Sequence, residues 1–225
     1  MAQHHSLRAR LAALHEERKR TWEPAALQAN IDQRQRLVDQ ADPSRWVKAG
    51  DVVAEFELRE VDGGTLTLDG LLGRGPLVLV FFRFAGCPAC NIALPYYQER
   101  LAPGLAALGA QLVAVSPQVP EKLVEIKRRH GFDFRVASDG NALGRRFGIL
   151  YEPDEAAKAA ARAKGSFIGD TTGLGTWELP QPAVVVIGQD RVVRFAEVSP
   201  DWLVRAEAEP VLEAVRNLQA RAAAE

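Results

Sequence analysis

The chain has 225 residues, 47% of them hydrophobic and 25% charged, which is the composition of an ordinary globular protein with enough apolar residues for a large core. Its 28 lysines and arginines nearly balance 29 aspartates and glutamates, so no basic excess points to nucleic acid or an anionic membrane as a partner. No apolar stretch approaches the length of a membrane span, and the first ten residues lack the apolar core of a signal peptide. With only two cysteines in the chain, these features favour the reducing cytoplasm.

The first part of the chain, residues 1–45, predicts a helical arm that precedes a main domain at residues 46–225. Leu7 and Leu11 begin a leucine repeat at helical spacing, and Pro24 ends or kinks the first of two expected helices. The apolar stripe of this arm is sparse. We expect it to pack either on the main domain or on a second copy of the chain, which leaves a homodimer open.

The main domain is expected to begin with a β-hairpin. Alternating apolar residues at 52–59 and 65–68 flank the turn residues Asp62-Gly63-Gly64. Asp69 is expected to cap a short helical turn after the hairpin. An apolar run rich in β-branched and aromatic residues follows at 77–82, and it predicts a buried central strand.

Strand and helix patterns then alternate to the end of the chain. Such alternation implies parallel strands joined by right-handed crossovers. A segment rich in glycine and threonine, 165–176, is expected as a loop. The other expected elements are strands at 111–116 and 134–137, helices at about 121–130, 141–147 and 153–164, an antiparallel hairpin of 183–187 with 192–195, and a closing helix at 207–222.

The two cysteines, Cys87 and Cys90, lie at C-x-x-C spacing directly after the central strand. Pro88 is expected at the first position of the following helix, where its missing N–H loses no hydrogen bond. This places Cys87 at the helix start as the more exposed sulfur and Cys90 one turn inward. Unpaired backbone N–H groups and the helix dipole stabilise a thiolate there, so the motif predicts a redox site.

Two other interpretations of the cysteines remain open. Buried free cysteines pack like small hydrophobic residues and serve as structural thiols. A zinc site would have to recruit further ligands from distant histidines, because zinc is normally held by four nitrogen or sulfur ligands. The chain has only His4, His5, His15 and His130 to offer, so we expect neither a metal nor another cofactor.

Three segments carry a resemblance to a known family: Phe82–Asn91 (FRFAGCPACN), Leu112–Gln118 (LVAVSPQ) and Trp177–Pro182 (WELPQP). They and the order of elements over about residues 46–220 resemble the alkyl hydroperoxide reductase and thiol-specific antioxidant (AhpC/TSA) family, in its peroxiredoxin-like branch with a C-P-x-C site. The resemblance implies an α/β, thioredoxin-like fold. A central mixed sheet flanked by helices would carry the N-terminal β-hairpin and the helical arm.

The resemblance also implies site residues. Typical peroxiredoxins carry P-x-x-x-T-x-x-C, in which the last cysteine attacks the peroxide. Laid on this chain, that cysteine is Cys90, the threonine position is Cys87 and the proline position is Arg83. The family also places an arginine just before the strand that here begins near Ala183. This chain has Pro182 there, at the point where thioredoxin-like reductases carry a cis-proline facing the cysteine pair.

The roles within the site are not decided by the sequence. Disulfide exchange favours Cys87 as the first nucleophile, whereas the resemblance favours Cys90 as the thiolate that attacks peroxide. Either order ends in a Cys87–Cys90 disulfide. Arg83 either stabilises the thiolate and orients the peroxide, or is a strand-end arginine that reaches solvent or a carboxylate. Pro182 is either cis, with a functional role, or a trans proline that leads into a strand.

We therefore expect a thiol-dependent peroxidase that reduces hydrogen or alkyl peroxides. Its predicted catalytic residues are Cys87, Cys90, Arg83 and Pro182, and its partners are the peroxide and an external dithiol reductant of the thioredoxin or glutaredoxin kind. A thioredoxin-like oxidoreductase acting on protein disulfides is the alternative enzyme. A redox-sensing module, whose arm changes partners when the disulfide forms, is the alternative from another class.

Overall fold

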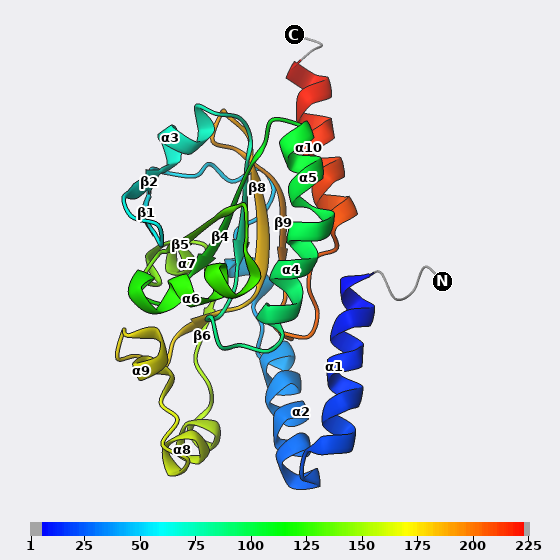
Figure 1. Ribbon diagram of the computed structural model, residues 1–225, viewed down its shortest axis with the longest axis vertical. Helices are drawn as coiled ribbons and strands as arrows, with labels where there is room; N and C mark the ends of the chain where they lie inside the picture. Colours follow the sequence, from blue (N-terminus) through cyan, green and yellow to red (C-terminus); the bar gives the residue numbers. More distant parts are fainter. Residues whose placement is uncertain (1–5, 223–225) are drawn as a thin grey trace.

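The computed structural model describes residues 6–222, and a seven-stranded mixed sheet forms the centre of that part of the chain (Figure 1). The strands β3 (Leu77–Phe81), β4 (Gln111–Ser116) and β5 (Arg135–Ser138) run parallel to one another. On the far side of β3, β8 (Ala183–Ile187) and β9 (Val193–Val198) continue the sheet in antiparallel pairing. Every residue of β3 and β8 is buried, as expected for strands covered on both faces.

The predicted hairpin closes the other edge of the sheet. β1 (Glu57–Glu60) pairs antiparallel with β2 (Thr65–Thr67) and with β5, so the strand order is β2-β1-β5-β4-β3-β8-β9. A short helix, α3 (Leu68–Leu72), follows directly. Its N-cap is Thr67, whose hydroxyl accepts the N–H of Gly70 at 3.1 Å. The expectation that Asp69 caps this helix is therefore wrong, because the helix begins one residue before it.

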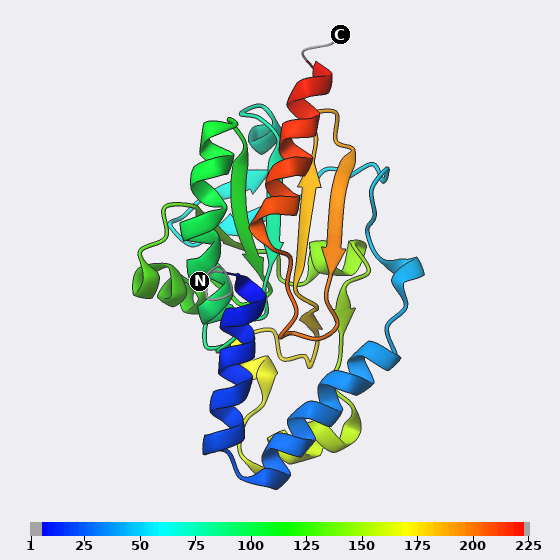
Figure 2. The same cartoon turned by 90° about the vertical axis from the view of Figure 1, so that its right-hand side faces the viewer.

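Helices cover both faces of the sheet, which confirms the predicted α/β architecture (Figures 1 and 2). The apolar side chains divide into two clusters, one on each face. Residues of α3 and of α7 (Ala142–Arg146) belong to the cluster on one face. The helices whose residues belong to the cluster on the other face include α4 (Cys90–Arg100), α5 (Ala102–Ala107), α6 (Pro120–His130) and α10 (Ala208–Ala222).

The segment between α7 and β8 contains both a confirmed element and two that the sequence pattern misses. The surface helix α8 (Glu155–Ala163) lies where a helix is predicted. The expected loop at 165–176 contains the short helix α9 (Ile168–Thr172), so that expectation is wrong in part. A two-stranded sheet of β6 (Leu150–Tyr151) and β7 (Leu179–Pro180) also forms. β6 and β7 have two residues each, too few to show an alternating pattern, and α9 lies in a segment whose glycines and threonines indicate a loop.

The arm forms the two predicted helices, α1 (Leu7–Thr21) and α2 (Pro24–Asp39), with Pro24 at the start of the second. They lie at one end of the domain in Figure 2. α1 packs along α4, and the side chains of Leu7 and Leu11 are fully buried there. The arm thus packs on its own domain. Residues 1–5 of the predicted arm lie outside the described residues.

A single carboxylate from the far end of the chain caps the arm. Glu207 accepts the N–H groups of Leu7 and Arg8 at 3.0 and 2.9 Å, and its carboxylate also accepts the hydroxyl of Tyr96 at 2.6 Å. A negative charge at this point satisfies the unpaired N–H groups at the N-terminus of α1 and complements its dipole. The arm is therefore docked by polar contacts as well as by two leucines.

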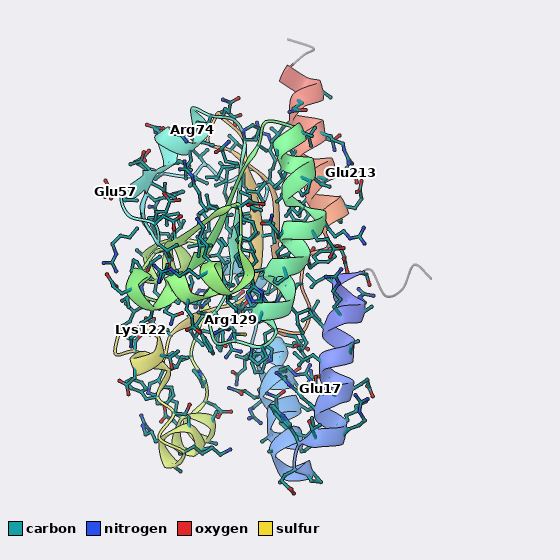
Figure 3. The ribbon with its side chains drawn as sticks, in the orientation of Figure 1. Glu17, Glu57, Arg74, Lys122, Arg129 and Glu213 are labelled. Carbon is teal, nitrogen blue, oxygen red and sulfur yellow. The ribbon has the colours of Figure 1, made fainter. Side chains whose placement is uncertain are left out.

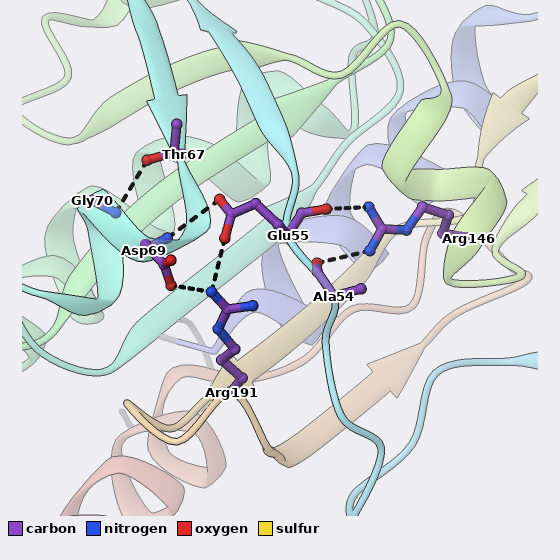
Figure 4. A network of polar contacts seen from close by, with 7 residues as sticks. All are labelled: Ala54, Glu55, Thr67, Asp69, Gly70, Arg146 and Arg191. Atoms are coloured by element: carbon purple, nitrogen blue, oxygen red, sulfur yellow. Dashed lines mark hydrogen bonds and ion pairs between the residues drawn. The ribbon is translucent and has the colours of Figure 1, made fainter.

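Two arginines hold the segment before the hairpin against its neighbours (Figure 4). Arg146 of α7 donates to the carbonyls of Ala54 and Glu55 at 2.7 and 2.8 Å. Arg191, in the turn before β9, bridges the carboxylates of Glu55 and Asp69. Within residues 6–222, no helix is both long enough and apolar enough to cross a membrane.

Candidate active site

The two cysteines lie where the loop after β3 enters α4, and both are free thiols. Cys87 forms a turn before the helix, because its carbonyl accepts the N–H groups of Cys90 and Asn91, each at 3.0 Å. α4 begins at Cys90, not at Pro88. Cys87 is 1% exposed and Cys90 0%. Cys87 therefore lies before the helix and not at its first residue, and the expected difference in exposure between the two sulfurs is negligible because both are buried.

The pKa values of the two cysteines are shifted in opposite directions. A hydrogen bond with Cys90, together with burial, raises the pKa of Cys87 well above its usual value. Burial acts to raise the pKa of Cys90 as well, but the hydrogen bond from Cys87 and the charge of Arg205 outweigh it and lower that pKa well below its usual value. A hydrogen bond donated to the charged form stabilises that form. These directions favour the thiolate at Cys90 over the thiolate at Cys87.

Arg205 supplies the cation nearest to Cys90, and the sequence analysis does not find it. Its Nη2 lies 3.5 Å from the Sγ of Cys90, and its Nε donates to the carbonyl of Trp202 at 3.1 Å. Arg205 is only 7% exposed and lies in the segment between β9 and α10. The one signal in the sequence is an arginine set among apolar residues, and no spacing connects it to the cysteines.

Arg83 points toward the cysteines. Its guanidinium interacts electrostatically with Cys87 and Cys90, and its Cζ lies 4.6 Å from the ring centroid of Trp202 and 5.5 Å from that of Phe84. Arg83 makes no ion pair with a carboxylate among the residues described. Of the two interpretations of this residue, the geometry matches the cation beside the thiols and not the arginine paired at the strand end.

Pro182 does not have the expected backbone conformation. No peptide bond within residues 6–222 is cis, so the bond before Pro182 is trans and the cis interpretation is wrong. Its carbonyl accepts the N–H of Ser199 at 2.8 Å, which extends the antiparallel pairing of β8 with β9 by one step. Pro182 is buried and lines a small internal cavity together with Tyr97 and Arg205. It is thus the strand-leading proline of the alternative interpretation.

The amide side chains of Asn91 and Gln118 hydrogen-bond to the backbone of the loop that carries the cysteines. Asn91 donates to the carbonyls of Ala85 and Cys87 at 2.7 and 2.9 Å. Gln118, which follows β4, accepts the N–H of Ala85 at 2.8 Å. Arg129 of α6, labelled in Figure 3, donates to the side-chain oxygen of Asn91 at 3.0 Å. These contacts join the loop to α6 and to the sheet, so the sulfur positions are set by several elements at once.

The arm completes the enclosure of the site. Arg18 of α1 is only 6% exposed, and its guanidinium stacks over the ring of Trp22 at 4.7 Å. It interacts electrostatically with Cys87 and with Arg83. The helical pattern predicts α1 but not this contact, because an arginine on a charged helix is normally taken for a solvent-facing residue.

The described residues offer no cluster of metal ligands near the cysteines. No group of three His, Cys, Asp or Glu side chains gathers within residues 6–222. His130 lies 2.8 Å from the side-chain oxygen of Asn91, where it takes part in the loop contacts described above. His4 and His5, considered for the zinc interpretation, lie outside the described range.

Comparison with known proteins agrees with this geometry. The AhpC/TSA family model matches residues 49–196. The curated "Putative peroxiredoxin Rv1608c" of Mycobacterium tuberculosis is 32% identical over 104 residues, which cover 46% of this chain and 67% of that protein. The structure of peroxidoxin BcpB from M. tuberculosis has a TM-score of 0.58 at 25% identity, covering 76% of this chain and 98% of that one. Peroxiredoxin Q of Xanthomonas campestris shares the fold with a TM-score of 0.55 at 20% identity, over 72% of this chain and 90% of that one.

The family match covers more than half of the chain and includes both cysteines, Arg83 and Pro182. The central mixed sheet with flanking helices is the thioredoxin-like arrangement that the resemblance implies. The chain therefore belongs to the AhpC/TSA family, and it is an oxidoreductase of the thiol peroxidase kind.

Proposed function

We propose that the chain reduces peroxides through Cys90 as the attacking thiolate and Cys87 as the resolving thiol. The observation that carries this assignment is the position of the Arg205 guanidinium, whose Nη2 lies 3.5 Å from the Sγ of Cys90, and the lowered pKa of Cys90 beside the raised pKa of Cys87 agrees with it. The thiolate is the nucleophilic form of cysteine, so the sulfur that holds the charge attacks first. The family resemblance likewise implies that Cys90 attacks first, whereas disulfide exchange favours Cys87 as the first nucleophile.

The proposed reaction has two chemical steps at the pair. The Cys90 thiolate attacks the terminal peroxide oxygen, the O–O bond breaks, and the leaving alkoxide takes up a proton to become an alcohol, or water from hydrogen peroxide. Cys90 is then a sulfenic acid. The Cys87 sulfur displaces its hydroxyl as water, which forms the Cys87–Cys90 disulfide. An external dithiol, of the thioredoxin or glutaredoxin kind, reduces this disulfide and is itself oxidised.

In this proposal Arg205 acts on Cys90 and Arg83 acts on Cys87. Arg205 stabilises the Cys90 thiolate from hydrogen-bond distance. It would thereby replace the arginine that the family carries at the position of Pro182. Arg83 lowers the pKa of Cys87 against the larger effects of hydrogen bonding and burial, so it favours the resolving thiolate. Pro182 has only a positioning role, because it lines the same small cavity as Arg205 and helps to fix its shape.

The burial of both sulfurs supports small peroxides as substrates over protein disulfides. A protein disulfide would have to reach sulfurs that are 1% and 0% exposed, whereas a peroxide needs only a narrow path. The trans bond before Pro182 also removes the feature that the disulfide-exchange interpretation relied on. We place the activity in the cytoplasm, where dithiol reductants are available. A homodimer stays a prediction, to be checked by sizing the reduced and oxidised protein.

Stopped-flow oxidation of the reduced protein by hydrogen peroxide and by an alkyl hydroperoxide tests the assignment. Tryptophan fluorescence is a suitable signal, because Trp202 contacts Arg83 beside the site. We expect Cys90→Ser to abolish peroxide consumption. Cys87→Ser should still react once and stop at a sulfenic acid, which dimedone traps and mass spectrometry locates on Cys90.

The opposite pattern would reverse the assignment of the two cysteines. Full peroxide turnover in both single variants would refute the peroxidase. Rapid reduction of insulin disulfides with negligible peroxide consumption would instead promote the thiol–disulfide oxidoreductase. A change of oligomeric state on oxidation, with neither activity, would favour the sensor.

A further inference from the structure

The chain between the last strand and the last helix links the arm to Cys90. Residues 199–207, which join β9 to α10, lie within the described range and contain neither helix nor strand. They pass the end of the sheet that faces the arm (Figure 2), and we call this segment the connector. It carries Arg205, whose Nη2 lies 3.5 Å from the Sγ of Cys90.

The connector is buried although it has no regular structure. Trp202, Arg205 and Ala206 are only 4%, 7% and 4% exposed. Segments of this kind normally lie on the surface, because buried backbone polar groups need partners. Here the carbonyl of Trp202 accepts the Nε of Arg205 at 3.1 Å, and the carbonyl of Ala206 accepts the hydroxyl of Tyr97 at 2.8 Å. The position of the Arg205 guanidinium therefore depends on the path of the connector.

The arm contacts the connector on both sides of Arg205. Arg34 of α2 forms an ion pair with Asp201, with 2.8 Å between Nη1 and Oδ2. The other carboxylate oxygen of Asp201 accepts the N–H of Leu203 at 2.8 Å, so the ion pair holds the turn that precedes Arg205. At the end of the connector, Glu207 caps the N-terminus of α1. Displacing the arm would therefore release the connector at two points.

The ion pair of Arg34 is more enclosed than that of Arg36 on the same helix. The side chains of Arg34 and Asp201 are 12% and 22% exposed, whereas those of Arg36 and Asp154 are 43% and 33% exposed. Solvent screens an enclosed pair less than an exposed one. Asp154 is the N-cap of α8, so the pair of Arg36 joins the arm to a different part of the domain.

We propose that Arg34 and Asp201 are positioning residues for Cys90, because their ion pair holds the connector where the Arg205 guanidinium lies beside the Cys90 sulfur. The arm is then a part of the active site as well as its cover. Attraction between charges falls with distance, so a small displacement of Arg205 weakens its effect on the thiolate. This inference rests on the proposed role of Cys90 for its effect on peroxide reduction, but the positioning of Arg205 does not require that function.

Two other groups act on the charge of Cys90. A hydrogen bond with Cys87 and one from the backbone N–H of Arg83 also lower the pKa of Cys90. Neither group belongs to the connector, so substitutions at residues 34 and 201 leave both in place.

The pH profile of Cys90 alkylation tests the positioning role. Iodoacetamide reacts with the thiolate, and mass spectrometry measures the label on Cys90 in the full-length protein. The midpoint of the profile reports the pKa of Cys90, whereas the plateau reports access to the sulfur, so opening of the arm is measured separately. We expect Arg34→Gln to raise the midpoint by about half a pH unit, less than Arg205→Met, which removes the cation itself.

Asp201→Asn separates positioning from a direct effect of charge. The new side chain keeps an acceptor for the N–H of Leu203 but loses the ion pair. If the ion pair positions Arg205, Asp201→Asn raises the midpoint as Arg34→Gln does. If the two charges act directly on Cys90, removing the cation raises the midpoint and removing the anion lowers it. Opposite shifts would therefore overturn the proposal, as would an unmoved midpoint in either variant.

Arg36→Gln is the matched control, because it removes the same charge and an ion pair from the same helix without touching the connector. A shift equal to that of Arg34→Gln would overturn the proposal. Arg34→Lys keeps the charge and should retain most of the wild-type midpoint. Arg34→Gln combined with Arg205→Met should shift the midpoint no further than Arg205→Met alone, because the positioned residue is absent. A further shift would mean that Arg34 acts on Cys90 by another route, which also overturns the proposal.

The two proposals fail in different ways. A protein that consumes no peroxide, but whose midpoint rises in both Arg34→Gln and Asp201→Asn, refutes the peroxidase and retains the positioning role. A protein that reduces peroxide, with a midpoint that Arg205→Met moves and Arg34→Gln does not, retains the peroxidase and refutes the positioning role.

Discussion

The sheet and the arm are held in place by different kinds of contact. In β3 every side chain is buried in one of the two apolar clusters. In the described part of the arm only Leu7, Leu11 and Leu37 are buried hydrophobic residues. Polar contacts supply further docking, through the carboxylate of Glu207 and through the ion pairs of Arg10 with Glu99 and of Arg34 with Asp201. Burial of apolar area is cooperative across a core, whereas polar contacts act one by one. The sheet that carries the cysteine loop should therefore be rigid, and the arm that covers the cysteines should open without unfolding the sheet.

The largest effect is expected in the sheet. Leu79 of β3 is 0% exposed, and Leu79→Ala should lower the free energy of unfolding by about 3 kcal/mol, because it removes buried methyl groups and leaves a cavity. Urea denaturation measures this change. Val38→Ala is the control, since Val38 is 44% exposed on α2 and should change stability little. Equal losses in the two variants would contradict the difference between sheet and arm.

A similar leucine in the arm should act on the cover of the site. Leu11→Ala is expected to weaken docking of α1 by about 2 kcal/mol, since Leu11 is also 0% exposed. If the arm opens separately, the cysteines become accessible more often. Alkylation by iodoacetamide should then accelerate about tenfold or more, with a smaller loss of global stability than in Leu79→Ala. Unchanged alkylation would mean that the arm does not limit access.

Arg205 lies between β9 and α10 beside Cys90, and its removal should act on chemistry more than on folding. Arg205→Met is expected to raise the pKa of Cys90 by about one unit or more, because the nearest cation is lost from a buried thiolate. The pH profile of alkylation reports this shift. Arg216→Met, at an exposed position of α10, is the control and should leave the profile in place. A profile unmoved by Arg205→Met would remove Arg205 from the site.

The polar anchor of the arm should depend on pH. Glu207→Gln is expected to weaken arm docking by about 1 kcal/mol through loss of a charged helix cap. Burial acts to raise the pKa of Glu207, but its hydrogen bonds from Tyr96, Arg8 and Leu7 outweigh this and lower it below 4.5. The stabilisation is therefore full above pH 4.5 and is lost as the pH falls through the lowered value.

Urea denaturation of the wild type and of Glu207→Gln at neutral and acidic pH measures this dependence. The two proteins should differ at pH 7 and converge in acid. A constant difference at both pH values would show that the charge of Glu207 does not stabilise the arm.

The smallest effect is expected on the outer face of the arm. Lys19 and Glu16 form an ion pair whose side chains are 49% and 56% exposed. Solvent screens such pairs, so Lys19→Gln should change stability by less than about 0.5 kcal/mol. A larger loss by denaturation would mean that surface charges of α1 contribute to docking as strongly as Glu207 does.

Local patterns in the sequence were sufficient for most of the regular elements. The central strand, the arm helices and the closing helix have long or clearly alternating patterns, and they lie where they were predicted. The hairpin forms as predicted except that its first strand covers Glu57–Glu60 and not 52–59. The strands β6 and β7 were missed because two residues show no period, and α9 was missed because the glycines and threonines around it indicate a loop. The start of α4 was predicted at Pro88, but the helix begins at Cys90. Proline suits both a tight turn and the first turn of a helix, so the sequence does not distinguish them.

The candidate site divides in the same way. The motif around Cys87 and Cys90 is local, so spacing and context are enough to predict a redox pair there. The proposed direction of attack needs the fold, because it depends on which sulfur meets Arg205 from a distant segment. Arg18 was missed for the same reason, since its burial arises only when the arm folds over the domain.

The sequence by itself thus determined the alternating strands and helices and a cysteine pair between a buried strand and a helix, because periodicity and spacing are properties of neighbouring residues. The thioredoxin-like peroxidase frame followed from the resemblance to the AhpC/TSA family. Only the tertiary structure decided that both thiols are enclosed, that the bond before Pro182 is trans and that Arg205 lies beside Cys90. Electrostatic interactions act through space, and residues 18, 83 and 205 meet only when the chain is folded.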